Sequence, residues 1–460
     1  MIVCKFGGTS VQDAEAMTRL AGIVKARLDR KPVVVASAMG KTTNKLLDAA
    51  RLAARGERQK AVEAVRALED SHLGEARKLG FAFDGEGKDW VYDTLQAYFK
   101  QLRDLVKGLS ALGELTPRIT DAVASFGERL STVILTEALR RNGVDAELMD
   151  ARDCIITDED FTRAAPVFEL TNPAIVKHLQ PVLDAGRVPV FQGFIGRSRG
   201  GVTTTIGRGG SDYSAAIVGA ALGAEDIQIW TDVDGVLTTD PRMVPEARRI
   251  RAISFEEAAE LSYFGAKVLH PATIIPAVKK NIPVRVLNSY RPEKEGTIIT
   301  EAAPPCDNPV KAISFKGGVT VVNVISTRML MAYGFLQEIF ATFARYKVPV
   351  DVVSTSEVSV SLTVDGGVDI GPIAADLEKI AEVAVERDKA LVCCVGENLK
   401  NVTRALYTAM GAFKDIKIHM ISQGASAINI TFVIDEENMP EAVKRLHAAF
   451  FKDVDSRVFE

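Results

Sequence analysis

The chain has 460 residues, more than one hydrophobic core can organise, so two or three domains are expected. With 47% hydrophobic and 25% charged residues, its composition is that of an ordinary soluble globular protein. The net charge of −4 provides no positive field for nucleic acid or an anionic membrane surface, so an anionic substrate must be held by local charges.

The five cysteines and five histidines show neither a disulfide framework nor metal-ligand spacing. Scattered cysteines of this kind are typical of a reducing compartment. The N-terminus lacks the charged and apolar regions of a signal peptide, and no apolar run approaches the roughly 20 residues that span a bilayer. We therefore expect a cytoplasmic protein with no membrane or nucleic-acid partner and no metal held by the protein itself.

The first fifty residues alternate between strand and helix. The expected strands are 2–6 and 32–37, and each opens into a loop of small and hydroxyl residues. Continuous apolar strands separated by helices indicate a buried parallel sheet. Residues 45–142 are rich in Ala, Leu, Glu, Lys and Arg, which predicts an inserted layer of helices.

Strand and helix alternate again further along the chain. The expected elements are three strands, at 188–195, 203–206 and 227–230, and a helix at 213–222. This alternation predicts a doubly wound α/β domain through about residue 300. Ligands of such domains collect at the carboxyl ends of the strands, where these polar loops lie. The sequence therefore predicts an anion or nucleotide site there.

The composition shifts after residue 305 to short β-branched strands and two helices. An internal repeat with an offset of 68 residues matches 348–354 with 416–422. A helix precedes each copy, at 336–346 and at 402–413. Two copies predict a pair of small βαβ-type domains rather than a solenoid.

The loop after the first strand combines a cation, two glycines and a hydroxyl. Lys5 can reach a phosphate, and Gly7 and Gly8 allow backbone N–H groups to approach phosphate oxygens. Ser10 is predicted to cap the helix that follows. A glycine turn after a strand is often purely structural, so both interpretations remain open on these residues alone.

A second glycine-rich loop, 207–212, has a similar design. Glycines before a helix capped by Ser or Asp predict another anion cradle, and Arg208 offers a fork for a carboxylate or phosphate. The loop is not a P-loop, and no ribose-binding acid follows it at the spacing of a dinucleotide fold. Four acidic residues remain open between a structural and a ligand-binding role: Glu128, Asp232, Asp234 and Asp240.

Seven motifs in order resemble the signature motifs of the aspartate kinases. They are KFGGTSV (5–11), SFGERLS (125–131), GFIG (193–196), TTIGRGGSDY (204–213), WTDVDG (230–235), TTDPR (238–242) and FGAKVLHP (264–271). One such motif would be weak evidence, whereas seven in order are specific. The helical insert and the tandem repeat resemble the monofunctional, lysine-sensitive type. The resemblance implies an α/β amino-acid kinase fold, a parallel-rich sheet sandwiched by helices, followed by two ferredoxin-like βαββαβ ACT domains.

The resemblance also implies a domain organisation. The catalytic domain would cover 1–300. The first ACT domain (317–388) would be inserted in the second, which comprises 308–316 plus 389–460. ACT domains usually pair across subunits, so a homodimer or higher homo-oligomer is implied. The length leaves no room for the homoserine dehydrogenase of the bifunctional type.

The implied reaction transfers the γ-phosphoryl of ATP, with Mg²⁺, to the β-carboxylate of L-aspartate, giving 4-phospho-L-aspartate and ADP. This is the first step toward lysine, threonine and methionine. The residues carried over to ATP are Lys5, Gly7, Gly8, Ser10, Thr231, Asp232, Arg242 and Lys267. Those carried over to aspartate are Ser37, Thr43, Glu128, Phe194, Arg208, Gly210, Ser211 and Asp212. Lys5, Arg208 and Asp212 are expected to be catalytic.

An amino-acid effector is implied at the ACT domains. The contacts carried over are Met329, Gly334, Phe335, Leu336, Val350, Asp351, Ser356 and Glu357. Asp351 and Glu357 suit the ammonium groups of lysine. Ala332 and Pro349 stand where the lysine-sensitive pattern has serines, so threonine as the effector, or a weakened response, is the alternative. Leu237 replaces a tyrosine of the nucleotide pocket. Two other functions are alternatives: a kinase acting on glutamate or acetylglutamate, and a catalytically silent amino-acid sensor.

Overall fold

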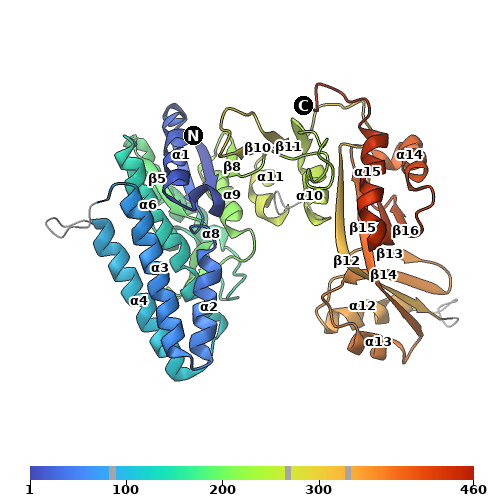
Figure 1. Ribbon diagram of the computed structural model, residues 1–460, viewed down its shortest axis with the longest axis horizontal. Helices are drawn as coiled ribbons and strands as arrows, with labels where there is room; N and C mark the ends of the chain where they lie inside the picture. The colour runs from blue at the N-terminus through green and yellow to red at the C-terminus, as the bar shows by residue number, and fades with distance from the viewer. Residues whose placement is uncertain (82–89, 265–270, 327–332) are drawn as a thin grey trace. The chain divides into compact units, whose positions relative to one another are not determined.

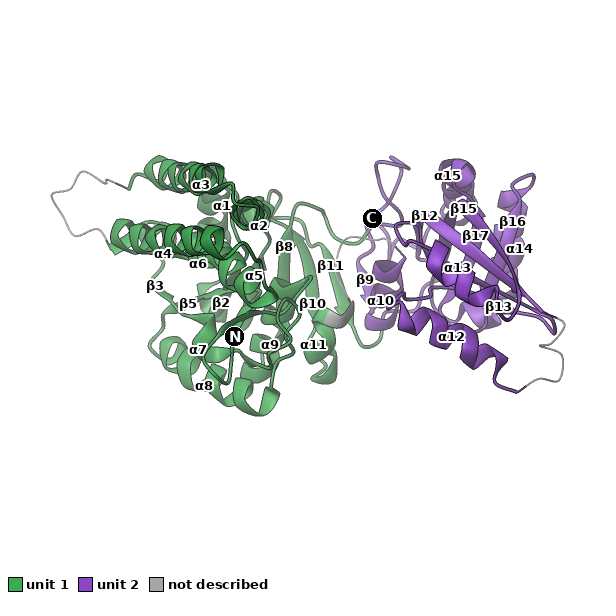
Figure 2. Ribbon diagram, turned by 90° about the horizontal axis from the view of Figure 1, so that it is seen from below, with its two compact units in different colours: residues 1–236, 269–302 green, residues 237–268, 303–460 purple. Residues whose placement is uncertain are grey.

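The computed structural model describes residues 1–81, 90–264, 271–326 and 333–460 (Figure 1). These residues form two compact units (Figure 2). The first comprises 1–236 and 269–302, and the second comprises 237–268 and 303–460.

The sheet of the first unit has the strand order β3-β5-β2-β1-β8-β10-β11. Its strands are β1 (Ile2–Phe6), β2 (Pro32–Ala36), β3 (Ala146–Leu148), β5 (Val188–Gln192), β8 (Ile227–Thr231), β10 (Val284–Asn288) and β11 (Thr297–Thr300). All neighbours pair in parallel except β10 and β11. The central strands β1 and β2 are buried at every residue, as their continuous apolar runs predict. The predicted parallel-rich sheet is confirmed.

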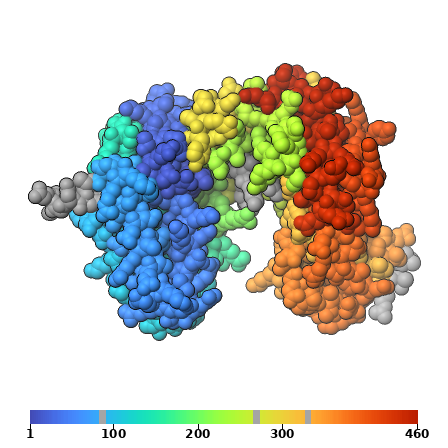
Figure 3. All heavy atoms as spheres, viewed as in Figure 1, coloured from blue at the N-terminus to red at the C-terminus, as the bar shows by residue number. Residues whose placement is uncertain are grey.

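Helices surround this sheet. They are α1 (Ala14–Lys25), α2 (Thr42–Ala54), α3 (Arg58–Lys78), α4 (Trp90–Leu112), α5 (Pro117–Ala124), α6 (Phe126–Arg141), α7 (Ala151–Cys154), α8 (Phe168–Asp184), α9 (Gly210–Leu222) and α11 (Ile275–Lys279), with short 3₁₀ turns η1 (Gly8–Val11), η2 (Leu28–Arg30) and η3 (Pro271–Ile274). Helix α6 is buried along most of its length and packs on β2, β3 and β5. Helices α2, α3 and α4 pack on one another further out, and blue atoms of this N-terminal part of the chain cover much of the face of the unit seen in Figure 3.

The buried residues of helix α4 explain how this outer layer packs against its neighbours. Its buried residues recur every three or four positions, from Val91 through Leu95 and Phe99 to Leu109, so one apolar stripe faces its neighbours. Within the described ranges, no helix is long and apolar enough to cross a membrane.

The strand expected at 188–195 is divided in the structure, which corrects that prediction. Strand β5 ends at Gln192, and Ile195 begins β6 (Ile195–Ser198), which joins β4 (Ile156–Thr157) and β7 (Thr203–Thr205) in a small second sheet. Phe194, between them, has a left-handed φ of 68°. A Cβ on Gly193 would lie 2.6 Å from Cβ of Ser211, so only glycine allows the chain to turn so close to α9.

The second unit is built on an antiparallel sheet of order β13-β14-β12-β15-β17-β16. Its strands are β12 (Ala312–Ile325), β13 (Val353–Thr355), β14 (Ser359–Asp365), β15 (Glu382–Val395), β16 (Ile418–Gln423) and β17 (Asn429–Asp435), and the unit also contains β9 (Ala252–Ser254), η5 (Leu399–Asn401) and η6 (Glu436–Asn438). Its helices are α10 (Phe255–Tyr263), α12 (Phe335–Arg345), α13 (Gly371–Leu377), α14 (Thr403–Phe413) and α15 (Met439–Phe450).

The two long strands serve both halves of this sheet. The part of β12 at 312–316 pairs with 391–395 of β15, and its part at 319–325 pairs with β14 and with 382–389 of β15. A register shift between Lys316 and Val319 separates the two parts. Each half then has two helices on its strands, so the predicted pair of ferredoxin-like ACT folds is confirmed.

A buried ion pair joins α10 to the residue before β12. Nζ of Lys311 lies 2.9 Å from Oε1 of Glu257, and both side chains are only 2% exposed. Oε2 of Glu257 accepts from the N–H of Ser254, completing a capping box at the start of α10.

We predict that Lys311→Met lowers the free energy of unfolding by about 3–5 kcal/mol, because it leaves a buried carboxylate without its cation. Hydrogen exchange of the amides in α10 and β12 is the suitable measurement, since both tryptophans lie in the first unit and report on that unit. Adding Glu257→Gln should restore most of the lost free energy of unfolding. Unchanged exchange in Lys311→Met would contradict the prediction.

Candidate active site

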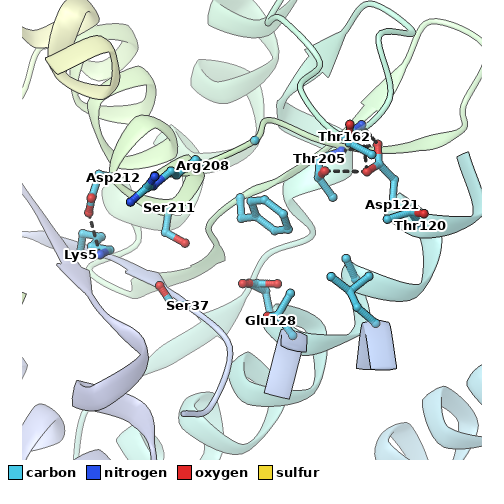
Figure 4. A pocket seen from close by; sticks show the side chains of 17 residues that line it. Lys5, Ser37, Thr120, Asp121, Glu128, Thr162, Thr205, Arg208, Ser211 and Asp212 are labelled. Carbon is cyan, nitrogen blue, oxygen red and sulfur yellow. Dashed lines mark hydrogen bonds and ion pairs between the residues drawn. The ribbon is translucent and has the colours of Figure 1, made fainter. Parts of the chain in front are cut away.

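A cavity of about 430 Å³ lies at the carboxyl ends of β1, β2 and β5 (Figure 4). Its lining contains all eight residues that the sequence assigns to aspartate, together with Lys5. These residues come from segments as far apart in the chain as β1 and α9. The structure therefore brings the residues together, and what each one binds stays a prediction.

Lys5 and Asp212 form an ion pair at one side of the cavity. Nζ of Lys5 lies 2.6 Å from Oδ1 of Asp212, and their side chains are 11% and 15% exposed (Figure 4). Lys5 is near the end of β1, and Asp212 is in the first turn of α9. The pair places one cation beside the start of a helix, where the helix dipole also favours an anion.

The N-terminus of α9 differs from the prediction. Its N-cap is Gly209, with a φ of 71°, and no side chain caps it, so the expected Ser or Asp cap is wrong. The N–H of Gly210 donates to the carbonyl of Gly207 at 3.0 Å, and the left-handed glycine N-cap provides no side-chain acceptor for the next N–H groups of the 13-residue helix. Arg208, just before it, is exposed and makes no ion pair within the described part of the chain. The arrangement suits an anionic ligand.

Glu128 is a buried acid with one unused oxygen. The residue is 4% exposed, and its Oε1 accepts from the N–H of Ala38 at 3.2 Å. Its Oε2 is buried without a hydrogen-bond partner among the residues described. Burial raises the pKa of Glu128 to about 8. An acid in this state fits a cationic ligand group, which would pair with the unused oxygen and favour the charged form.

Glycines allow the walls of the cavity to approach one another. A Cβ on Gly127 would lie 2.8 Å from Cβ of Ala38 and 3.1 Å from Oγ1 of Thr43, so glycine there lets α6 begin beside the loop after β2. A Cβ on Gly210 would lie 2.7 Å from Cδ2 of Phe194. The strained φ of Phe194 is held by a hydrogen bond of 3.0 Å from its N–H to Oγ of Ser214.

The hydrogen-bond partners of the loop after β1 differ from those predicted. The N–H of Gly7 donates to the carbonyl of Trp230, which leaves the N–H of Gly8, at the start of η1, for a ligand. The hydroxyl of Ser10 is buried and lies 2.8 Å from that of Ser289. Helix α1 is capped by Asp13 instead of Ser10, because Asp13 accepts from its third N–H. The predicted cap at Ser10 is therefore wrong.

The other residues assigned to ATP are placed as follows. Thr231 ends β8, with its hydroxyl 3.1 Å from the carboxylate of the exposed Asp232. Arg242 belongs to the second unit, where it pairs with Asp240 at 2.5 Å. Lys267 lies outside the described residues.

Two of the four open acids, Asp234 and Asp240, pair with an arginine. Asp234 pairs with Arg291 at 2.7 Å and accepts from the amide of Asn288 at 2.6 Å. Asp240 is engaged with Arg242. Both residues therefore serve as local anchors of their loops.

Asp351 is the best-defined of the residues assigned to an effector. It accepts from Nζ of Lys316 at 3.0 Å and from the hydroxyl of Tyr263 at 2.7 Å. The remaining described members are exposed or partly exposed, apart from the buried Phe335. Met329 and the departure at Ala332 lie outside the described residues.

Asp121, Thr120, Thr162 and Thr205 also line the cavity and were missed by the sequence interpretation. Asp121 is 1% exposed. The helical period of α5 places it three residues before the buried Ala124, on the buried face. An acidic residue in that position is rare, and this was the signal available in the sequence.

Comparisons with known proteins cover both parts of the chain. The amino acid kinase family matches residues 1–288, and an ACT domain matches 392–450. Aspartokinase 2, chloroplastic, of Arabidopsis thaliana is 40% identical over 98% of this chain and 84% of its own. Lysine-sensitive aspartokinase 3 of Escherichia coli is 37% identical over 98% of this chain and 99% of its own.

Two solved structures of E. coli aspartokinase III share the fold. The complex with aspartate and ADP (R-state) has a TM-score of 0.84 at 36% identity, covering 98% of this chain and 100% of that one. The complex with lysine and aspartate (T-state) has a TM-score of 0.81 at 36% identity, covering 98% and 99%. With identity of this level along nearly the whole chain, the protein belongs to the amino acid kinase family and, within it, to the aspartokinases.

Proposed function

We propose that this protein transfers the γ-phosphoryl of ATP to the β-carboxylate of L-aspartate, giving 4-phospho-L-aspartate and ADP, as the first step toward lysine, threonine and methionine. The observation that carries the proposal is a cavity lined by a buried carboxylate, a guanidinium and a paired lysine; one oxygen of the carboxylate and the guanidinium have no partner among the described residues. Aspartate has one ammonium and two carboxylates, so the charges of the cavity match those of the substrate.

Each charged group of aspartate would have a partner in the cavity. The unused oxygen of Glu128 would accept from the ammonium, and the fork of Arg208 would hold the α-carboxylate. The β-carboxylate would then lie toward Thr43 and Lys5. Ser37, Phe194, Gly210, Ser211 and Asp212 complete the walls.

The phosphates of ATP would be held by donors at this end of the sheet. These are the N–H groups of Ser211 and Asp212 in the first turn of α9, the N–H of Gly8, and the ammonium of Lys5, which Asp212 also contacts. Among the described residues no cluster of three or more His, Cys, Asp or Glu could hold a metal ion. Mg²⁺ would accompany ATP and would neutralise charge on its phosphates.

The chemistry needs no general base. A β-carboxylate is already ionised at pH 7, and it attacks the γ-phosphorus while the bond to the β-phosphate oxygen breaks. Catalysis is then positioning and neutralisation of the charge on the transferring group. Asp212 holds the ammonium of Lys5 in place for this purpose.

The ACT folds support feedback control by an amino acid. We propose lysine as the effector, with Asp351 and Glu357 receiving its ammonium groups, and homodimer formation through these domains. The proposed boundaries are 1–300 for the kinase domain, 317–388 for the first ACT domain, and 308–316 plus 389–460 for the second. The register shift in β12 between Lys316 and Val319 supports the division at 317.

One assay tests both the chemistry and its control. Purified protein with Mg-ATP and hydroxylamine should form aspartyl hydroxamate with aspartate and none with glutamate. Lysine, threonine and methionine are then titrated separately, and lysine is expected to inhibit. Equal turnover of glutamate would refute the proposed substrate, and inhibition by threonine alone would refute the proposed effector.

A further inference from the structure

One carboxylate in the cavity is already saturated by protein groups. Oδ2 of Asp121 accepts from the N–H groups of Thr162 and Thr205, both at 2.9 Å (Figure 4). Its Oδ1 accepts from the hydroxyl of Thr205 at 2.6 Å. Asp121 has no cation partner in the part of the chain that the structure describes. It is therefore committed to two backbone segments rather than available to a ligand.

Both segments adjoin the loop that carries Arg208. Thr205 ends β7, three residues before Arg208. The carbonyl oxygen of Thr162 would lie 3.4 Å from a Cβ placed on Gly207, so the 162 segment packs against the turn itself. The N–H of Ala164 also donates to the carbonyl of Thr205 at 2.9 Å. Asp121 thus holds together the strand and the segment that support this turn.

Within the Arg208 loop, the N–H of Gly210 donates to the carbonyl of Gly207 at 3.0 Å, so a backbone hydrogen bond closes the turn. Gly207 and Gly209, on either side of Arg208, have φ of 78° and 71°, conformations that glycine adopts and leaves easily. Arg208 itself is exposed and has no ion pair among the described residues. Thr162 has a φ of 75°, unusual for a residue with a Cβ, and its N–H is the one that Asp121 accepts.

We propose that Asp121 is a positioning residue that fixes the Arg208 loop so that the guanidinium meets the α-carboxylate of the substrate. This rests on the function proposed above, in which Arg208 binds that carboxylate. Asp121 acts through hydrogen bonds, and its charge makes no contact with the substrate.

Two substitutions separate geometry from charge. In Asp121→Asn, the amide oxygen can accept both N–H groups while the amide nitrogen donates to the hydroxyl of Thr205, so the anchor is kept without the charge. Asp121→Ala removes these hydrogen bonds as well as the charge. We expect the aspartate KM to rise about 30-fold in Asp121→Ala, because small misplacements of a binding group cost up to about 10²-fold. In Asp121→Asn the aspartate KM should stay within about threefold of the native value. The ATP KM should change by less than about threefold in both variants.

Asp226→Ala is the matched control for loss of a buried carboxylate. Asp226 is 4% exposed and pairs with Arg30 and Arg285, just before β8, at the end of the sheet away from the cavity. Both alanine variants should have a lower Tm, and only Asp121→Ala should have a raised aspartate KM. Similar loss of aspartate affinity in Asp121→Asn and Asp121→Ala would overturn the proposal, since charge would then be what matters.

A double-mutant cycle shows whether Asp121 acts through Arg208. Arg208→Met should raise the aspartate KM, and adding Asp121→Ala should raise it little further. Full additivity would overturn the proposal for Asp121, whereas no effect of Arg208→Met alone would overturn the role of Arg208 in the proposed function. Hydrogen exchange of amides 206–210 should speed up in Asp121→Ala and stay as in the native protein in Arg208→Met.

If Asp121→Ala does not fold, Thr205→Val carries the test. It removes only the 2.6 Å hydroxyl bond and retains the N–H bond to the carboxylate. We expect a rise of about threefold to tenfold in the aspartate KM, with faster exchange of amides 206–210. An aspartate KM and exchange equal to those of the native protein would overturn the proposal.

Discussion

Lys5→Ala is expected to lower kcat by about 10³-fold while the aspartate KM changes by less than about threefold. The ammonium of Lys5 is nearly buried and held by Asp212, so it is oriented before the reaction begins. Charge on the transferring phosphoryl group develops in the transition state, and a fixed cation stabilises that state more than the bound substrates. Steady-state kinetics with each substrate varied separately is the measurement.

The second unit offers a matched control for this variant. Lys389 is also 11% exposed in its side chain and pairs with an aspartate, Asp435, at 2.6 Å. Lys389→Ala should therefore remove a comparable ion pair and leave kcat close to that of the native protein. If both lysine variants lost kcat equally, or if Lys5→Ala raised only the aspartate KM, the assignment of Lys5 to the transition state would be wrong.

The sheet was predictable because its strands carry their own signal. The apolar runs of β1 and β2 are bounded by loops of small residues, and a run of this kind has few alternatives to a buried parallel strand. The break between β5 and β6 was not predictable in the same way. It depends on the close approach of Gly193 to Ser211, a contact between residues 18 positions apart that no local pattern encodes.

The same distinction applies to the cavity. Lys5, Glu128 and Arg208 could be proposed from motifs, since each motif is a short continuous segment. The hydrogen-bond state of each group could not. Ser10 was expected to cap a helix and is instead engaged with Ser289, far along the chain, while Asp13 takes the cap. Tertiary contacts decide which of several local donors and acceptors are used.

Glu128→Gln is expected to raise the aspartate KM about 10²-fold with a smaller effect on kcat. The change replaces the charged partner of the substrate ammonium by a neutral amide of the same shape, and loss of one partner of a buried charge pair costs about 2–5 kcal/mol. Glu137→Gln, on the same helix and outside the lining of the cavity, is the control and should leave the aspartate KM unchanged.

The pH dependence provides a separate test of the same contact. Burial raises the pKa of Glu128 to about 8 in the empty cavity, so below pH 8 the free enzyme holds a proton on this acid. An ammonium binds only the charged form. The aspartate KM should therefore rise as the pH falls from 8, by up to about tenfold for each pH unit. The rise should end when the pH reaches the pKa of Glu128 in the complex, which is lower than in the free enzyme.

Calorimetry should detect the proton that leaves Glu128 when aspartate binds. At pH 7 most of the free enzyme is protonated at Glu128, and the bound ammonium lowers the pKa of this carboxyl group, so aspartate binding releases close to one proton. Titrations in two buffers of different ionisation enthalpy give the number released. Glu128→Gln should abolish both this release and the rise of the aspartate KM below pH 8. A native enzyme whose aspartate KM is constant from pH 6 to 8, with no proton released, would place the ammonium away from Glu128.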